Sequence, residues 1–321
     1  MSRYGSALGA TLAGIANRFS TARRLPGLAP EHRVDGQTWL VTGATSGLGL
    51  AIARQLAERG AEVVMAARRE AGEALTQVAS AGGPAPRRLD LDLARLASVR
   101  AAAERLAEDG VRLDGVVLNA GMVAQRSRLT DDGLDEMTQV NFLGHFLLMQ
   151  DILRSGVLPT GRAPAARVVV VSSESHRSAE ALDPATLTAA REYGARQSVA
   201  EYGRTKLMVT TFAQALARRL HDGDRLQVAV HALCPGAVDT NIAREAPSWS
   251  QPVLKGVFRA FFRAPEAAAE PALYLACHPD LSRRTGVYLH LMQEKAPSAL
   301  ATDHAAQDAL WSAAGAAVAR P

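Results

Sequence analysis

A tyrosine and a lysine stand four residues apart in the segment Tyr202-Gly203-Arg204-Thr205-Lys206. Positions i and i+4 of a helix lie on the same face, so a helix here would hold the two side chains as neighbours. A free tyrosine has a pKa of about 10, and a nearby ammonium group lowers that pKa by stabilising the phenolate. The pair therefore indicates proton transfer by Tyr202, assisted by Lys206, to or from an oxygen atom of a substrate.

A glycine-rich segment, T-G-A-T-S-G-L-G, occupies residues 42–49. It joins a short apolar segment, 39–41, to a segment with helical apolar periodicity, 48–59. A glycine turn between a strand and a helix brings backbone N–H groups and a helix N-terminus to an anionic ligand. The spacing is not that of a Walker loop, and a plain tight turn is the alternative. The residues predicted to contact a pyrophosphate are Gly43, Thr45, Ser46, Gly47, Leu48 and Gly49.

The end of the second expected strand carries two arginines, Arg68 and Arg69, and the first acidic residue is delayed to Glu70. At this position an acid binds the ribose 2′-hydroxyl of NAD, whereas an arginine accommodates the 2′-phosphate of NADP. A charge-assisted hydrogen bond contributes about 1.5–3 kcal/mol, enough for a tenfold preference. Arg68 therefore favours NADP(H) over NAD(H); the alternative is that both arginines are solvated surface charges.

Strand and helix patterns alternate over most of the chain. The expected strands are 39–41, 61–66, 115–118, 168–171 and 226–233, and the expected helices are 48–59, 73–80, 96–106, 137–154 and 201–220. Alternation of this kind predicts βαβ units. We expect an α/β fold with a single Rossmann-type, doubly wound parallel sheet flanked by helices, and one catalytic domain spanning residues 36–321.

Composition excludes several classes of protein. Of 321 residues, 48% are hydrophobic, which rules out a disordered chain, and no uninterrupted apolar run suits a membrane span. The two cysteines, Cys234 and Cys277, provide neither a disulfide framework nor a metal cluster, so we expect no metal and a cytoplasmic setting. The formal net charge is only +4, with arginines scattered among acids, so we expect no nucleic-acid partner.

Residues 1–35 differ from the rest and form a basic amphipathic arm. Leu8, Leu12, Ile15 and Phe19 fall on one face of a possible helix, among several arginines. One interpretation is a helical arm packed on its own domain, and another is disorder. A third is peripheral membrane contact through residues 1–33.

Four motifs together resemble the short-chain dehydrogenase/reductase family in order and spacing: the glycine loop at 42–49, Asn119-Ala120-Gly121, the segment 202–206, and Pro235-Gly236. The segments 92–100, 139–146 and 171–176 are similar to those of the retinol-dehydrogenase-like branch, as is the tail around 285–311. The resemblance covers the chain from about residue 36 onward. It implies a carbonyl reductase or alcohol dehydrogenase that uses a nicotinamide cofactor, and it leaves homo-oligomers possible.

The resemblance also implies roles for individual residues. Ser173 would hold the substrate oxygen against Tyr202, with Ser172 and Ser175 as rival positions, and Lys206 would assist Tyr202 and contact the cofactor. Asn141 would anchor a water that relays protons to Lys206; its alternative is a core asparagine bonded to backbone. Further cofactor contacts would come from Asp92 and Leu93 at the adenine, from Asn119, Ala120 and Gly121 at the ribose, and from Pro235, Gly236, Val238 and Thr240 at the nicotinamide.

Two positions depart from the family pattern. Leu118 stands where the family usually has asparagine before Asn119-Ala120-Gly121, and Leu50 follows the glycine loop where many relatives of the branch have lysine. Neither change touches the catalytic groups. The predicted preference for NADP(H) therefore depends chiefly on Arg68.

The segment 241–264 concentrates aromatic side chains in a chain that is only 5% aromatic. We expect it to form an apolar lid over a lipophilic aldehyde, ketone or alcohol, with Trp249 and Phe258 as substrate contacts. A helix packed on the core is the alternative. A different class of function, a non-catalytic NADP(H)-binding sensor or scaffold on the same fold, is also open. The four intact groups Asn141, Ser173, Tyr202 and Lys206 argue against it.

Overall fold

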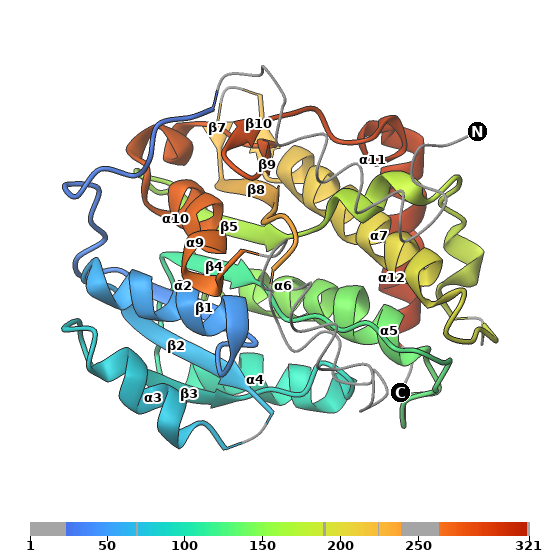
Figure 1. Cartoon of the computed structure of the whole chain (residues 1–321), viewed down its shortest axis with the longest axis horizontal. Coiled ribbons are helices and arrows are strands. Elements are labelled where there is room, and N and C mark those ends of the chain that lie inside the picture. The colour runs from blue at the N-terminus through green and yellow to red at the C-terminus, as the bar shows by residue number, and fades with distance from the viewer. Residues whose placement is uncertain (1–23, 69, 189–190, 224, 239–262, 320–321) are drawn as a thin grey trace.

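The computed structural model describes residues 24–68, 70–188, 191–223, 225–238 and 263–319. Within these residues, eight strands form one sheet in the order β10-β9-β8-β5-β4-β1-β2-β3, and β10 alone runs antiparallel to its neighbour (Figure 1). The strands of the sheet are β1 (Thr38–Thr42), β2 (Glu62–Ala67), β3 (Arg87–Asp90), β4 (Gly115–Leu118), β5 (Ala166–Val171), β8 (Val228–Cys234), β9 (Tyr288–His290) and β10 (Gln293–Glu294). A separate hairpin pairs β6 (His221–Asp222) with β7 (Arg225–Leu226).

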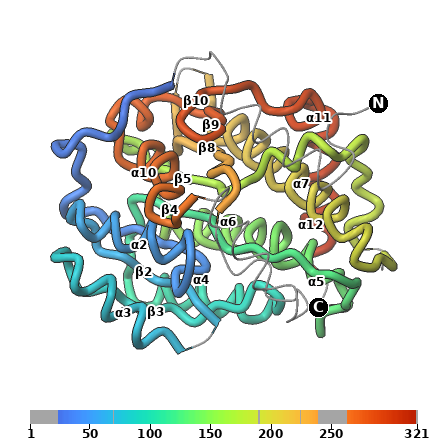
Figure 2. Tube along the Cα trace, viewed as in Figure 1, coloured from blue at the N-terminus to red at the C-terminus, as the bar shows by residue number. Residues whose placement is uncertain are grey.

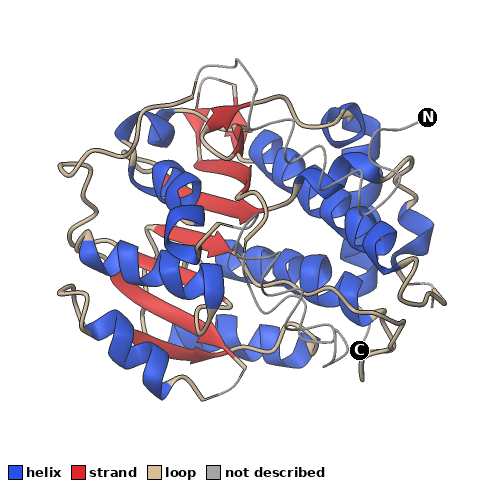
Figure 3. Cartoon of the chain, viewed as in Figure 1, coloured by secondary structure: helices blue, strands red, loops and turns tan. Residues whose placement is uncertain are grey.

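Helices cover both faces of the sheet (Figure 3). One face packs on α4 (Leu96–Glu108), α6 (Gly144–Arg154), α7 (Ser198–Arg219) and α12 (His304–Val318), and the other packs on α2 (Gly47–Glu58), α3 (Gly72–Ala79) and α10 (Glu270–Cys277). The shorter helical segments are α5 (Glu136–Thr138), α9 (Pro265–Ala268), α11 (Ala299–Thr302) and the 3₁₀ turns Glu174–Ser178, Pro184–Leu187 and Pro279–Arg283. The predicted α/β class and parallel sheet are confirmed.

The valines of β5 show how the sequence produces this layered core. Val168 and Val170 belong to the hydrophobic cluster on one side of the sheet, and Val169 and Val171 belong to the cluster on the other side. Alternate side chains of a strand point to opposite faces, and a strand covered by helices on both faces is apolar along most of its length. The four-valine run thus marks a central strand, between β4 and β8.

The strand order reverses between β1 and β4. β1 continues to β2 and β3 on one side, whereas β4 continues to β5 and β8 on the other. In open α/β sheets a ligand binds outside the carboxyl ends of the strands at such a point, because the loops diverge there and leave a crevice. The glycine loop follows β1, and Asn119 follows β4, so both motifs lie at this crevice.

Two expected elements differ from the structure, and one strand of the structure was not expected. The predicted helix 137–154 is interrupted by a π-helical turn, Gln139–Leu143, which joins α5 to α6. The predicted strand 226–233 divides into the end of β7 and the longer β8. β3 was not predicted, because only Leu89 of its four residues is buried and the apolar pattern of a strand is lost.

The first described residues run beside the C-terminal part of the sheet, where the Leu25 N–H donates to the Met292 carbonyl at 2.7 Å (Figure 2). Most of the predicted basic arm, residues 1–23, lies outside the described residues, and so does its possible membrane contact. Among the helices that the structure describes, none has the length and apolar character needed to span a bilayer.

Candidate active site

The glycine loop closes tightly on the neighbouring strand end. Gly43 has a φ of +66°, which favours glycine, and a Cβ there would stand 3.0 Å from the Ala120 Cα. A Cβ on Gly49 would stand 2.2 Å from the Gly43 carbonyl oxygen and 2.5 Å from Asn119 Nδ2. The two glycines therefore let the loop, α2 and the turn after β4 approach one another more closely than side chains would permit.

The N-terminus of α2 is open toward this loop. Ser46 precedes the helix in an extended conformation, makes no capping hydrogen bond and is exposed, and no acidic residue occupies the first turn. The first N–H groups of a helix lack partners within the helix and attract anions. The loop and helix end thus fit the pyrophosphate of a dinucleotide, with Thr45, Gly47 and Leu48 beside it.

Thr42 organises the base of the crevice. Its Oγ1 accepts hydrogen bonds from the Asn119 and Ala120 N–H groups at 2.9 and 3.0 Å, and its carbonyl accepts from Asn119 Nδ2 at 3.0 Å. Thr42 Oγ1 also lies 3.0 Å from Nε2 of His145. Nδ1 of the same imidazole is 3.3 Å from the Asn141 carbonyl oxygen. Burial lowers the pKa of His145 to about 4, so this bridging imidazole is neutral. No role was predicted for His145 from the sequence, although His145 belongs to the segment 139–146 and lies four residues after Asn141.

The residues expected near the adenosine lie at the ends of β2 and β3. Arg68 is exposed directly after β2, and no other described side chain pairs with it. Asp92 accepts a hydrogen bond from the Ala94 N–H at 3.0 Å, which orders the turn before α4. Leu93 is buried against Gly144, so its side chain offers little surface to a nucleotide. The structure therefore brings Arg68 and Asp92, rather than Leu93, to the surface.

Asn141 lies in the π-helical turn and binds backbone on the neighbouring loop. Its Oδ1 accepts from the Met122 N–H at 2.8 Å, and its Nδ2 donates to the Met122 carbonyl and to Thr205 Oγ1, both at 3.0 Å. π-helical turns occur often at functional sites. A Cβ on Gly121 would lie 3.3 Å from Asn141 Oδ1 and 3.7 Å from Lys206 Nζ, so this glycine leaves a space that both polar groups border.

Lys206 and Tyr202 lie on one face of α7, as their spacing predicts. Lys206 Nζ donates to the Val171 carbonyl at 2.9 Å and lies 5.6 Å from the centroid of the Tyr202 ring. Lys206 is only 4% exposed, and burial lowers its pKa to about 8. The backbone of β5 thus holds the ammonium group against the ring of Tyr202.

The electrostatics of Tyr202 differ from our expectation. Burial raises the pKa of its phenol above the ordinary value of 10.0, Cys234 acts in the same direction, and a hydrogen bond with Ser173 acts in the opposite direction. Lys206 lies over the ring and not at the phenol oxygen, so it does not offset the effect of burial. Ionisation of Tyr202 near neutral pH therefore requires positive charge in addition to Lys206.

Ser173 is the serine that acts on the Tyr202 phenol, whose pKa it lowers. The rival Ser172 is buried, 2.5 Å from Thr210 Oγ1, and so belongs to the packing between β5 and α7. Ser175 lies in the following turn, where its Oγ accepts from Ser173 Oγ at 3.0 Å. The geometry favours Ser173 over both rivals as the group that holds a substrate oxygen.

The segment after β8 completes the crevice. Pro235 is buried, and the Gly236 N–H points to Cys234 Sγ at 3.4 Å. Val238 pairs with Arg263, whose N–H donates to the Ala237 carbonyl at 2.9 Å. Val238 and Arg263, which are far apart in sequence, are therefore neighbours in space. Thr240, Trp249, Phe258 and nearly all of the expected lid lie outside the described residues.

Comparison with known proteins decides the family. The model of the short chain dehydrogenase family matches residues 37–185. Retinol dehydrogenase 14 of Mus musculus is 36% identical over 323 residues, which cover 95% of this chain and 93% of that protein. The chain belongs to the short-chain dehydrogenase/reductase family. Its resemblance to the retinol-dehydrogenase-like branch, predicted from the motifs, is confirmed, and it is an NAD(P)-dependent dehydrogenase/reductase.

Two further relatives bear on the fold and on the substrate. Polyprenol dehydrogenase of Mus musculus is 34% identical over 311 residues, covering 96% of this chain and 90% of that protein. Among solved structures, a protein from Beutenbergia cavernae that is named as an NAD(P)-dependent gluconate 5-dehydrogenase, with NADP bound at low occupancy, superposes with a TM-score of 0.62 at 26% identity, over 82% of this chain and 97% of that one. This short-chain dehydrogenase/reductase thus resembles relatives along nearly its full length.

Proposed function

We propose that this enzyme is an NADP(H)-dependent oxidoreductase that interconverts a lipophilic aldehyde or ketone and its alcohol. The observation that carries the proposal is the pairing of Tyr202 and Lys206 on one face of α7, where Lys206 Nζ is fixed by the Val171 carbonyl 5.6 Å from the centroid of the Tyr202 ring, with Ser173 acting on the same phenol. Two relatives named for apolar alcohols, retinol dehydrogenase 14 and polyprenol dehydrogenase, support a lipophilic substrate. Arg68 and the NADP bound to the gluconate 5-dehydrogenase support the choice of nucleotide.

The residues of the site divide the chemistry among them. In reduction, the Tyr202 hydroxyl donates its proton to the carbonyl oxygen, and in oxidation the same atom takes the proton back. When substrate binds, Ser173 Oγ exchanges the hydrogen bond that it donates to Ser175 Oγ for one to that oxygen, and so holds the oxygen against Tyr202. When bound, the nicotinamide supplies or accepts the hydride at carbon, and its oxidised form adds the positive charge that Tyr202 needs.

Lys206 and Asn141 serve the bound cofactor and the proton path. One Lys206 donor is used by Val171, which leaves two N–H donors free to reach a ribose hydroxyl. The space beside Gly121, bordered by Asn141 Oδ1 and Lys206 Nζ, is where a proton can pass between Lys206 and solvent. Asn141 is also a core asparagine bonded to the Met122 backbone, so the two interpretations of this residue are compatible.

The test is oxidation of NADPH against NADH with a panel of apolar aldehydes and ketones, including retinal and a polyprenal. We expect turnover with NADPH that falls by at least a hundredfold in Tyr202→Phe, because the general acid is lost, while NADPH binding is unchanged. Preference for NADH would contradict the assignment of the nucleotide. Binding of NADPH without turnover on any carbonyl of the panel would contradict the assignment of the substrate.

A further inference from the structure

Ser173 begins a short 3₁₀ turn, Glu174–Ser178, and that turn sets the direction of its side chain. Ser173 Oγ accepts a hydrogen bond from the Ser175 N–H at 3.2 Å and donates one to Ser175 Oγ at 3.0 Å. A hydroxyl held by the turn that it caps moves whenever the turn moves. The position of the turn therefore decides where Ser173 meets a substrate oxygen.

The turn is held between two other parts of the chain. On one side it rests on α7 at Gly203, where a Cβ would stand 2.3 Å from Ser178 Oγ and 2.9 Å from the Ser175 carbonyl oxygen. Gly203 adjoins Tyr202 in sequence, so the turn and the tyrosine share one support. On the other side lies the segment 288–298, which begins at β9.

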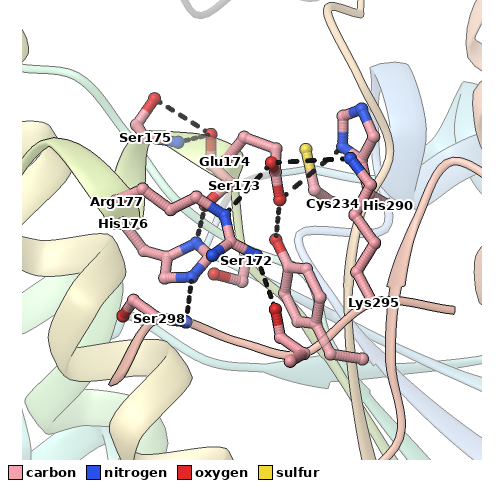
Figure 4. A network of polar contacts seen from close by, with 12 residues as sticks. Ser172, Ser173, Glu174, Ser175, His176, Arg177, Cys234, His290, Lys295 and Ser298 are labelled. Atoms are coloured by element: carbon pink, nitrogen blue, oxygen red, sulfur yellow. Dashed lines mark hydrogen bonds and ion pairs between the residues drawn. The ribbon is translucent and has the colours of Figure 1, made fainter. Parts of the chain in front are cut away.

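His176 joins the turn to this segment (Figure 4). Its Nδ1 lies 2.7 Å from the Ser173 carbonyl oxygen, and its Nε2 lies 3.1 Å from the Ser298 backbone nitrogen. Because Nε2 accepts the Ser298 N–H, the ring proton is on Nδ1 and is donated to Ser173. The ring is fully buried and packs edge-on against Tyr288 at 5.3 Å, and burial lowers the pKa of His176, which favours this neutral form.

Two neighbours of His176 brace the same contact. Glu174 accepts a hydrogen bond from the Tyr288 hydroxyl at 2.9 Å. Arg177 donates to Glu174 at 3.2 Å and to the Ala296 carbonyl at 2.6 Å. Burial acts to raise the pKa of Glu174, but the cationic and hydroxyl groups around it hold that pKa below its ordinary value, so the brace is charged. Three side chains of one turn thus attach it to one segment.

We propose that His176 is a positioning residue for Ser173, which it holds by its peptide carbonyl and ties to the backbone of Ser298. The inference rests on the proposed function of Ser173 as the group that holds the substrate oxygen. Such a contact affects the rate of the chemical step, because a displacement of about 1 Å in a catalytic group can cost a hundredfold in rate. We expect it to leave NADPH binding unchanged, because none of the residues proposed to contact the cofactor takes part in the contact between His176 and Ser298.

Ser298 allows a test at the backbone N–H that His176 accepts. Its φ is −64°, the angle that proline imposes, so Ser298→Pro fits this backbone angle, removes the N–H that His176 accepts and sets the proline ring against His176 Nε2. Ser298→Ala keeps that N–H and removes only the side-chain hydroxyl, which is buried and has no partner in the described structure. The hydrogen bond between the Ser298 N–H and His176 Nε2 is therefore lost in Ser298→Pro and kept in Ser298→Ala.

The experiment measures kcat, KM and the NADPH dissociation constant for both variants, with Ser173 intact and in a Ser173→Ala background. With Ser173 intact we expect Ser298→Pro to lower kcat at least tenfold relative to Ser298→Ala, with NADPH affinity unchanged within twofold. In the Ser173→Ala background the two variants should have equal kcat, because His176 affects the reaction through the Ser173 hydroxyl, which is absent there. A merely structural role would give the same loss in both backgrounds and would overturn the inference.

Two further results separate the inference from the proposed function. If Ser173→Ala keeps the wild-type rate, Ser173 does not hold the substrate oxygen, and both the proposal for Ser173 and the inference fail. If Ser173→Ala loses activity but Ser298→Pro matches Ser298→Ala, the inference alone is overturned. Should Ser298→Pro not fold, the pair His176→Asn and His176→Gln is used in the same two backgrounds, because the first keeps a donor for Ser173 and the second an acceptor for Ser298.

Discussion

Asn141 Nδ2 donates a hydrogen bond to Thr205 Oγ1 at 3.0 Å, and this bond joins the π-helical turn to the catalytic helix α7. Thr205 Oγ1 in turn donates to the Tyr202 carbonyl at 2.9 Å. The threonine is fully buried, one residue before Lys206. The amide of Asn141 thus connects to the backbone of Tyr202 through one hydroxyl group.

We predict that Thr205→Val destabilises the enzyme by about 1–3 kcal/mol, because Asn141 then loses a buried acceptor. Thr211→Val is the matched control on the same helix, since the Thr211 hydroxyl is buried with no partner in the described structure. Its removal should be neutral or stabilising. Chemical denaturation of the two variants measures the difference, and equal unfolding free energies would contradict the proposed chain of hydrogen bonds.

Burial of the charged Lys206, to which our proposal gives a catalytic role, lowers the stability of the fold. Its folded pKa is about 8, below the ordinary 10.5, so the charged form is disfavoured by folding at every pH below about 8. That shift corresponds to about 3 kcal/mol, of which the hydrogen bond to Val171 offsets roughly 1. We predict that Lys206→Met is more stable than the wild type by about 2 kcal/mol at pH 7 and has no measurable turnover.

The pH dependence of the stability difference between Lys206→Met and the wild type tests the direction of the pKa shift of Lys206. The cost of the charged lysine disappears as the pH rises from about 8 to 10.5, because the unfolded chain then loses the same proton. The stability gap between Lys206→Met and the wild type should therefore shrink between pH 7 and pH 10 in denaturant titrations. A gap that stays constant would mean that the buried charge is not its cause.

Substitution by alanine is expected to have opposite effects on stability at Gly49 and at Gly315. Alanine at 49 would place a Cβ 2.2 Å from the Gly43 carbonyl oxygen, which cannot move without opening the loop. We predict a loss of at least 2 kcal/mol of stability and of measurable NADPH binding in Gly49→Ala. Gly315 lies within α12, where an added Cβ would have no neighbouring atom within 4 Å, so Gly315→Ala should gain about 1 kcal/mol. Thermal melts and fluorescence titration compare the two, and equal stabilities would contradict the tight loop.

Much of the site follows from local sequence, and the remainder depends on distant contacts. The glycine loop, Asn119–Gly121 and the Tyr202–Lys206 pair each need only a strand end or one helix turn, so their patterns predicted them. The π-helical turn could not be predicted in this way, because its side-chain partners Met122 and Thr205 come from other elements.

His176 and Ser298 are 122 residues apart in sequence, so no local sequence pattern predicts their contact. β3 was missed for a different reason. It is an edge strand with three exposed residues, so its sequence lacks the apolar signal of the interior strands. Sequence patterns therefore predict the candidate ligand-binding residues better than the residues that position those side chains.

Arg68 decides the nucleotide in our proposal, and a single substitution tests it. The side chain is exposed after β2 and has no described partner, so it is free to bind the 2′-phosphate of NADP(H). We predict that Arg68→Ala weakens NADPH binding at least tenfold, the loss of one charge-assisted hydrogen bond of about 1.5–3 kcal/mol, and leaves NADH binding within twofold. Arg105→Ala is the control, because Arg105 is an exposed arginine that pairs with Asp109 on α4. Fluorescence titration with both nucleotides measures the ratio of affinities. An equal loss for NADPH and NADH would show that Arg68 supports the loop rather than reads the phosphate, and the preference would then have to come from another cation.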